Sequence, residues 1–324
     1  MIKKPRNVPL ILQKYEALLR RLPKDHPKRE LIEQEVLKRR AGLEGEKSID
    51  YYLKGVPKER YYIFHNLRLP VEDEYAQFDT ILLSHSYILI LEIKNIKGTL
   101  YFDQSFHQLI RVKDEKEDGF PDPISQVNRQ QTLLSSWLQL HRLPVPPIES
   151  LIVISDPSTI IKASSYHKEI FQKVVRASNL SQKIKSFEAK HQVEKLTRKE
   201  MNKMSRLFHK EHTPLNSDIV SYFKLSREDI LTGVHCPSCS TLPIPKHPNR
   251  NKWKCPNCKK EHPHAHIYSL RDYALLISTT ITNRECREFL HIQSPWTTAR
   301  LLRSMNLPYT GSKSHPKYNL PLDE

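Results

Sequence analysis

The 324-residue sequence predicts an α/β fold with a mixed sheet, followed by a small cysteine-bearing module and a helical one. Three observations lead to this prediction. The apolar runs at 87–91 and 151–154 have the length of buried strands and are apolar on both faces. Between them, Asp122 followed by Pro123 is typical of a helix N-cap and first turn. Strands that are apolar on both faces and mixed with helices imply a sheet covered by helices.

The first long helix is expected over residues 36–53. Its apolar stripe includes Glu46, an unusual residue for a largely apolar face. Gly42 and Gly45 lie just before it, and each glycine lowers helix stability by roughly 1 kcal/mol. Either this helix approaches another element closely at the glycines, or it begins only near Glu44.

A hairpin is expected from the apolar runs at 77–83 and 87–94, after a first strand at 61–69. A turn centred on His85-Ser86 pairs Ile81 with Ile90. The elements that follow are strands at 99–102 and 107–112, a charged turn at 114–119, a helix from Asp122 to about Leu140 that carries Gln126, Gln130 and Gln131, a strand at 151–154, and helices near 166–175, 179–190 and 195–211.

The same hairpin register brings charged residues together. Asp79 lies opposite Glu92, and Lys94 shares the face of Glu92 because side chains alternate along a strand. Directly opposed residues lie roughly 5 Å apart. Two carboxylates and an ammonium therefore converge at the end of an apolar hairpin, where they could hold a divalent metal beside a polarised water. The alternative is an ion pair between Glu92 and Lys94 at the end of the strand.

Composition points to a polyanionic partner. Lys and Arg number 52 against 36 Asp and Glu, which gives a net charge of +16 and a pI near 9.5. Nucleic acid is the simplest such partner, and an anionic membrane surface is the weaker alternative. The longest apolar run has five residues, so no bilayer span is expected. The cysteine usage favours metal binding in a reducing, cytoplasmic compartment over disulfides.

Four of the five cysteines form two Cys-x-x-Cys pairs separated by 15 residues, namely Cys236, Cys239, Cys255 and Cys258. This spacing predicts a zinc ribbon with a tetrahedral four-thiolate site. Redox cysteines are the alternative. The fifth, Cys286, is expected to be a small buried residue in a helix. Basic residues surround the pairs and are expected to form a surface with one aromatic: Lys246, Arg250, Lys252, Lys254, Lys259, Lys260 and Trp253. Exposure is expected for the nearby histidines: His235, His247, His262, His264 and His266.

Three helices are expected after the ribbon. Their start signals are Ser269 with Asp272, Thr282 with Glu285, and Ser294 with Pro295. The last two helices resemble a helix-turn-helix, with polar and basic residues on the second of them: Thr297, Thr298, Arg300 and Arg303. A wing could begin at Tyr309. The alternative is an ordinary helical cap packed on the ribbon.

These elements suggest five domains: an N-terminal helical extension at 1–35, an α/β domain with the converging charged residues at 36–195, a basic helical linker at 196–232, a zinc ribbon at 233–267 and a helix-turn-helix-like module at 268–324.

A series of motifs in the N-terminal half resembles the nuclease-related domain of the restriction-endonuclease-like superfamily. The series consists of Gly42-x-x-Gly45-Glu46, Asn66-Leu67, Asp79, Glu92-Ile93-Lys94-Asn95 with Gly98, and Asp122-Pro123-x-x-Gln126. The resemblance covers about residues 38–160 and implies an αβββαβ core. It implies that Asp79, Glu92 and Lys94 are catalytic and that Glu46 and Gln126 are accessory. The carbonyl of Ile93 would be a further Mg²⁺ ligand.

The expected function is Mg²⁺- or Mn²⁺-dependent hydrolysis of phosphodiester bonds, in DNA rather than RNA, assisted by a nucleic-acid-binding tail with structural zinc. A homodimer is one possible oligomeric state, because cutting two strands often takes two active sites. One alternative is a DNA-binding or regulatory protein that uses an inactive nuclease fold as a scaffold. A further alternative is an RNA-binding zinc-ribbon protein.

Overall fold

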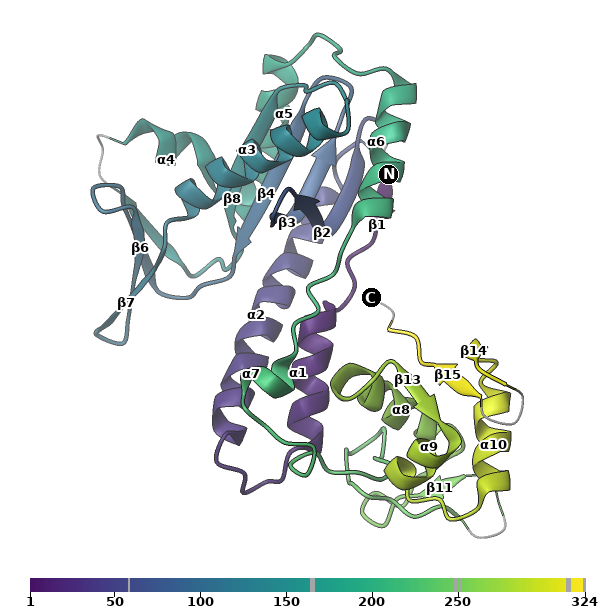
Figure 1. The fold of residues 1–324 in the computed structure, drawn as a ribbon. Helices are drawn as coiled ribbons and strands as arrows, with labels where there is room; N and C mark the ends of the chain where they lie inside the picture. The colour runs from purple at the N-terminus through teal and green to yellow at the C-terminus, as the bar shows by residue number, and fades with distance from the viewer. Residues whose placement is uncertain (58, 164–166, 248–249, 251, 313–315, 323–324) are drawn as a thin grey trace. The chain divides into compact units, whose positions relative to one another are not determined.

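The computed structural model in Figure 1 describes residues 1–57, 59–163, 167–247, 250, 252–312 and 316–322. Residue 166, at the start of one predicted helix, and residues 323–324, at the end of the predicted C-terminal module, lie outside these ranges. The chain divides into two compact units. Unit 1 contains Met1–Asn7 and Arg39–Pro214, and unit 2 contains Val8–Lys38 and Leu215–Glu324.

Unit 1 is built on a six-stranded mixed sheet in the order β1-β2-β3-β4-β8-β10 (Figure 1). Strands β2, β3 and β4 are antiparallel neighbours, whereas β8 is parallel to both β4 and β10. The strands are β1 (Ile2–Lys4), β2 (Tyr62–Val71), β3 (Glu74–Leu83), β4 (Ile88–Lys94), β8 (Ile148–Ile154) and β10 (Val174–Arg176). With α2 before β2 and α3 between β4 and β8, the predicted αβββαβ core is confirmed.

The hairpin register is also the predicted one, because Ile81 pairs with Ile90. Alternate residues of this hairpin enter different cores. Ile81 and Ile90 belong to a core with Trp137 of α3, whereas Leu82 belongs to a core with Ile49 of α2. The sheet is therefore buried on both faces, as its continuous apolar strands require.

Four longer helices cover this sheet. Helices α3 and α6 contribute to the first core, and α2 and α5 contribute to the second. Their bounds are α2 (Arg29–Leu53), α3 (Pro123–Leu140), α5 (Leu180–Lys190) and α6 (Arg198–Glu211), with the short helices α4 (Lys168–Lys173) and η1 (Ala177–Asn179) beside them. The side chain of Asp122 accepts hydrogen bonds from the backbone N–H groups of Ile124 and Ser125, so it is the predicted N-cap of α3.

A second sheet in unit 1 has the order β7-β6-β5-β9. Its strands are β5 (Thr99–Asp103), β6 (Gln108–Lys113), β7 (Lys116–Pro121) and β9 (Ile160–Ala163). The prediction of a charged turn over 114–119 was too long: the turn is confined to Asp114 and Glu115, both at positive φ, and β7 follows it. The charges of β7 are tolerated because that strand is at the edge of the sheet and mostly exposed.

The N-terminus departs from the helical extension expected over residues 1–35. Residues Ile2–Lys4 form strand β1, which pairs in parallel with β2 at the edge of the main sheet. The first helix is α1 (Leu10–Arg21), and α2 begins at Arg29, after a break that contains Pro23 and Pro27. Three residues are too few to show a strand period, so only the pairing with β2 identifies β1.

Helix α2 runs through both of its glycines, so the start near Glu44 was the wrong alternative. A Cβ atom built on Gly45 would lie 2.3 Å from Cβ of Asn95, which directly follows β4. Gly42 has open space around its Cα. Gly45 therefore permits the close approach of α2 to the end of β4.

Unit 2 combines helices with small sheets. Helix α1, the first turns of α2 and α7 (Ile219–Tyr222) share one core. A second core holds α8 (Ala265–Leu276), α9 (Asn283–Leu290), α10 (Pro295–Ser304) and the cysteine loops. The strands are β11 (Trp253–Lys254), β12 (Glu261–His262), β13 (Thr280–Thr282), β14 (Tyr309–Thr310) and β15 (Lys317–Asn319). The last three form an antiparallel sheet in the order β13-β15-β14.

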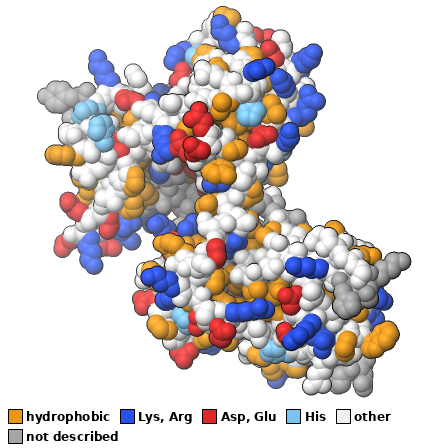
Figure 2. Space-filling model, in the orientation of Figure 1, with side chains coloured by type: hydrophobic (Ala, Val, Ile, Leu, Met, Phe, Trp, Pro, Cys, Tyr) orange, Lys and Arg blue, Asp and Glu red, His pale blue; other side chains and the backbone are white. Residues whose placement is uncertain are grey.

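Two of the three predicted helix starts are confirmed, at Thr282 with Glu285 and at Ser294. The start predicted at Ser269 with Asp272 was wrong, because α8 begins at Ala265 and both residues lie inside it, where they contact the buried His235 and Arg21. Cys286 is fully buried in α9, as expected. Among the described residues, no helix is both long enough and apolar enough to cross a bilayer. Figure 2 shows lysine and arginine side chains scattered over the visible face among acidic and hydrophobic ones.

Candidate functional site

The β3–β4 hairpin places Asp79 beside β4, as its register predicts. The backbone pairing ends at Thr80 and Leu91. One residue further on, Asp79 Oδ2 accepts a hydrogen bond of 2.8 Å from the backbone N–H of Ile93. This contact holds the Asp79 carboxylate at Ile93, the residue of β4 that lies between Glu92 and Lys94.

Glu92, Lys94 and Gln126 form a closed group of hydrogen bonds. Lys94 Nζ donates to Glu92 Oε1 and to Gln126 Oε1, both at 2.8 Å. Gln126 Nε2 donates to Glu92 Oε1 at 2.7 Å. Helix α3 carries Gln126 one turn after its N-cap, so the cap sets the position of this side chain. The ion pair between Glu92 and Lys94, which was the alternative to a metal site, is present, but it is one part of a larger polar group.

Gln130, one turn further along α3, joins this group and was not predicted to be part of the site. Its Nε2 donates to Glu92 Oε2 at 2.8 Å and to the Gln77 carbonyl at 2.9 Å. Its buried Oε1 has no hydrogen-bond partner among the described residues. The i, i+4 spacing of Gln126 and Gln130 on a helix that follows Glu92 was the signal that could have identified it.

Arg6 is the second residue that sequence reasoning missed. It follows β1, and its guanidinium donates to Glu46 Oε2 at 2.5 Å and to Asp50 at 3.0 and 3.1 Å. It also donates to Thr80 Oγ1 at 2.9 Å and approaches Nδ1 of the buried His65 at 2.9 Å. The Arg6 side chain is only 3% exposed. No local motif marks it, because its contacts come from residues 40 to 74 positions away.

Burial and mutual repulsion raise the pKa values of two carboxyl groups at this site. Burial raises the pKa of Glu46 to about 7, against the lowering effect of Arg6. The pKa of Asp79 lies well above its usual range because of burial and the nearby charges of Glu92 and Glu46. Burial also lowers the pKa of His65 to about 4, so this imidazole is neutral and can accept a hydrogen bond from Arg6.

The donor set suits a hard divalent cation. The negative charges of Asp79, Glu92 and Glu46 repel one another, and a bound cation would relieve this repulsion and lower the raised pKa values of Asp79 and Glu46. Carboxylate and amide oxygens are the ligands that Mg²⁺ and related cations take, and the free Oε1 of Gln130 adds one such oxygen nearby. These carboxylates do not form a tight ligand cluster among the described residues, because the oxygens of Glu92 are held by Lys94 and the two glutamines.

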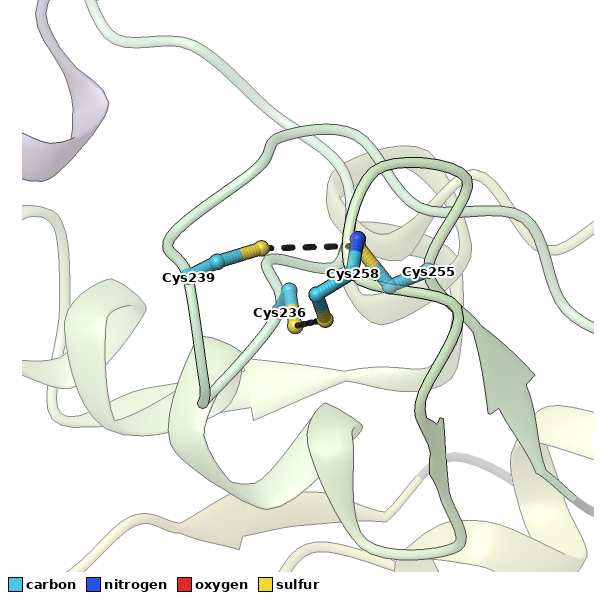
Figure 3. A group of neighbouring side chains, drawn as sticks. All are labelled: Cys236, Cys239, Cys255 and Cys258. Carbon is cyan, nitrogen blue, oxygen red and sulfur yellow. Dashed lines mark hydrogen bonds between the residues drawn. The ribbon is translucent and has the colours of Figure 1, made fainter.

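The four cysteines of unit 2 do form a tight cluster (Figure 3). Their sulfur atoms all lie within 4.8 Å of one another, with 3.6 Å between Cys236 and Cys258 and 3.5 Å between Cys239 and Cys255. A regular tetrahedron with Zn–S bonds of about 2.3 Å has S–S separations of about 3.8 Å. Hydrogen bonds from Thr241 lower the pKa of Cys239 to about 5, which favours a thiolate. The cluster could therefore hold a structural metal such as zinc.

Two histidines near this cluster are buried, contrary to the predicted exposure. His235 is 4% exposed and contacts Ser269 and Asp272, and Asp272 also binds the buried guanidinium of Arg21. His266 is 2% exposed and stacks on Trp253 with ring centroids 4.9 Å apart.

Trp253 itself is 1% exposed, so the predicted basic surface lacks its aromatic residue. The indole instead stacks on His266 and packs in the core of unit 2. The lysines and arginine around it remain at least partly accessible.

Comparison with known proteins agrees with this arrangement. Residues 41–155 match the family model of the nuclease-related domain. The protein therefore contains a nuclease-related domain, and the restriction-endonuclease-like core is consistent with it. This matched range contains Glu46, Asp79, Glu92, Lys94 and Gln126 but not Arg6.

Two individual matches are more distant. An uncharacterized protein of Bacillus anthracis is 26% identical over 104 residues, which cover 32% of this chain and 49% of that protein. The chain thus spans about half the length of this curated relative. The crystal structure of protein VC1899 from Vibrio cholerae covers 58% of each chain with 8% identity and a TM-score of 0.27.

Proposed function

We propose that unit 1 is a metal-dependent nuclease that hydrolyses phosphodiester bonds, with DNA as the preferred substrate. The observation that carries this proposal is the convergence of Asp79, Glu92, Lys94 and Gln126 at one end of the β3–β4 hairpin, within a nuclease-related domain. Burying charged side chains at the end of apolar strands costs folding free energy, so their presence there favours a functional role.

Each residue has a proposed role that follows from its chemistry. Asp79, Glu92 and the carbonyl of Ile93 would hold Mg²⁺ or Mn²⁺, with Glu46 as an accessory group. When bound, such a cation polarises a water and stabilises charge on the transferring phosphoryl group. Lys94 would donate from Nζ toward the developing negative charge or the attacking water. Gln126 bonds both Lys94 and Glu92, so it would keep both side chains aligned.

Unit 2 would supply affinity for nucleic acid. The chain order α8, β13, α9, α10, β14 and β15 is compatible with a helix-turn-helix followed by a wing, with α10 as the reading helix. Zinc at the four cysteines would hold its loops together. Binding that rests on phosphate contacts should weaken steeply as salt rises.

The test is cleavage of supercoiled plasmid, labelled single-stranded DNA and labelled RNA with Mg²⁺, with Mn²⁺ and without added divalent ion. Wild-type protein is compared with Lys94→Ala. The matched control is Lys113→Ala, because Lys113 lies in the same unit and its ammonium pairs with the exposed Asp114 on the surface. Binding is measured in parallel with Ca²⁺ in place of Mg²⁺.

We expect metal-dependent cleavage of DNA that Lys94→Ala abolishes and Lys113→Ala retains, with binding nearly equal in all three proteins. Equal cleavage by Lys94→Ala would remove this residue from the mechanism. Binding without cleavage under any condition would favour a DNA-binding protein with an inactive nuclease fold. Preferential binding and cleavage of RNA would change the substrate class.

A further inference from the structure

A pocket in unit 2 lies between helix α10 and the β14–β15 strands. We propose that it holds an unpaired nucleobase at a single-stranded end or junction of a nucleic acid, with Trp296 stacked on that base. This inference rests on the proposed function, because it names the part of the substrate that unit 2 recognises.

The pocket has the size and lining for a nucleotide. Its volume is about 690 Å³, within the usual range for small-molecule sites. Trp296 and Leu302 of α10 supply apolar wall, as does Tyr309 of β14. Arg303 and Asn306 add hydrogen-bonding groups that could meet a phosphate or a base edge.

Trp296 is the most informative residue of this pocket. It is 84% exposed, whereas the other two tryptophans of the chain, Trp137 and Trp253, are at most 1% exposed. An exposed indole on a pocket wall is typical of proteins that stack aromatic side chains on bases.

The backbone that carries Trp296 is held in place. Pro295 occupies the first turn of α10, and the N-cap Ser294 accepts a hydrogen bond from the Thr297 N–H. Asn283 of α9 donates to the Pro295 carbonyl at 3.1 Å. Trp296 therefore projects from a fixed helix start and not from a loose loop, which reduces the entropy cost of binding.

The charge around the pocket favours a polyanion. Arg303 lines it, and Arg300 and Lys317 are exposed on the elements that form it. No carboxylate is present among the described lining residues. Two carboxylates lie on neighbouring α9: Glu285 accepts from Thr282 and lies near Lys317, and Glu288 pairs with Arg284. A nucleic acid strand would bring phosphates to Arg303 and Arg300, whereas a protein partner with an apolar face would not, so a nucleic acid strand fits better.

The experiment uses the full chain and two synthetic DNAs at one salt concentration, without added divalent ion. One is a blunt 24-base-pair duplex, and the other is the same duplex with a four-nucleotide single-stranded overhang. A third DNA carries abasic sites throughout the overhang, which keeps the phosphates and removes the bases. Binding is followed by anisotropy of a label on the duplex end and by quenching of tryptophan fluorescence, which reports Trp296 because the other two indoles are buried.

We expect the overhang to tighten binding about tenfold over the blunt duplex, as stacking of one base implies. Trp296→Ala and the abasic overhang should each remove that gain, and Trp296→Phe should retain much of it. The matched control is Tyr222→Ala, which removes another exposed aromatic of unit 2 that is 73% exposed. Circular dichroism confirms that each variant is folded.

Equal affinity of wild-type protein for the blunt and overhang duplexes, without quenching, would overturn the proposal. A gain that Trp296→Ala retains would also overturn it. Self-association lost in Trp296→Ala, without any effect on DNA binding, would identify a protein contact instead. Failure of the proposed nuclease function can be told apart from failure of this inference. In the first case cleavage is absent, while the overhang still tightens binding.

Discussion

Replacing Arg6 by glutamine tests whether a residue outside the matched family range organises the site. Arg6 is 3% exposed at its side chain, and its partners Glu46 and Asp50 are 17% and 34% exposed. Removing one partner of a fully buried pair costs about 3–5 kcal/mol. Both carboxylates are partly exposed, and Glu46 can take up a proton near neutral pH. We therefore expect Arg6→Gln to lower the free energy of unfolding by about 2–3 kcal/mol.

The pH dependence of this loss follows from Glu46. Its pKa in the folded protein is raised to about 7, so its contribution to stability is greatest below its unfolded pKa and is lost as pH rises toward 7. Without Arg6 the pKa of Glu46 rises further, and the loss continues above pH 7. The stability difference between wild-type protein and Arg6→Gln should therefore be smaller near pH 5, where Arg6 still binds Asp50 and Thr80, than near pH 8.

The assay is calorimetric unfolding at pH 5 and pH 8 without added divalent ion. For a unit of roughly 180 residues, 2–3 kcal/mol corresponds to a fall of about 5–10 °C in its transition temperature. Arg111→Gln is the matched control. Arg111 pairs with the half-exposed Asp118 on the surface of the same unit, and such pairs contribute at most about 1 kcal/mol.

A double-mutant cycle with Glu46→Gln isolates the Arg6–Glu46 pair, because the double variant no longer buries an unpaired carboxylate at position 46 and the loss of the Arg6–Asp50 contact is common to both Arg6 variants. A coupling energy below about 0.5 kcal/mol, or equal losses at pH 5 and pH 8, would refute the reasoning.

Three further predictions concern packing, metal and acid stability. Gly45→Ala should cost about 1–2 kcal/mol in a urea titration because its methyl group would meet Asn95, whereas Gly42→Ala should not destabilise; equal effects would contradict the close approach. Cys255→Ser should reduce the zinc content of reduced protein from one ion per chain, and full occupancy in this variant would exclude Cys255 as a ligand. Burial lowers the pKa of His266 to about 4, so stability should fall as pH drops from 6.5 toward 4; His266→Phe should retain about 2 kcal/mol more at pH 4.5, and parallel pH curves would refute this.

The sequence predicted the parts of the fold that local pattern determines. The apolar runs of β4 and β8 are long and continuous, and the caps of α3, α9 and α10 are local hydrogen bonds between residues close together in the chain. The hairpin register followed from the short turn at His85-Ser86, which is why the sequence alone could assign Asp79 to a position beside Glu92.

Other parts depend on distant neighbours and could not be read locally. Strand β1 and Arg6 acquire their roles only from pairing with β2 and contact with α2. The burial of Trp253 and His266 likewise comes from packing across unit 2, while their surroundings in sequence are basic and polar. The basic and polar residues next to Trp253 and His266 in the sequence therefore predicted exposure, whereas tertiary contacts bury both side chains.

The two units are interleaved along the chain, since each contains two separate segments and one division falls within α2. No single cut of the gene can separate them. A fragment designed on the matched range 41–155 would lack Arg6, strands β1 and β10, and helices α5 and α6 that close both cores of the sheet. Recombinant work on the nuclease-related domain should therefore start from the whole chain. A shorter fragment that shows no activity could be misfolded, so its inactivity would not test the catalytic residues.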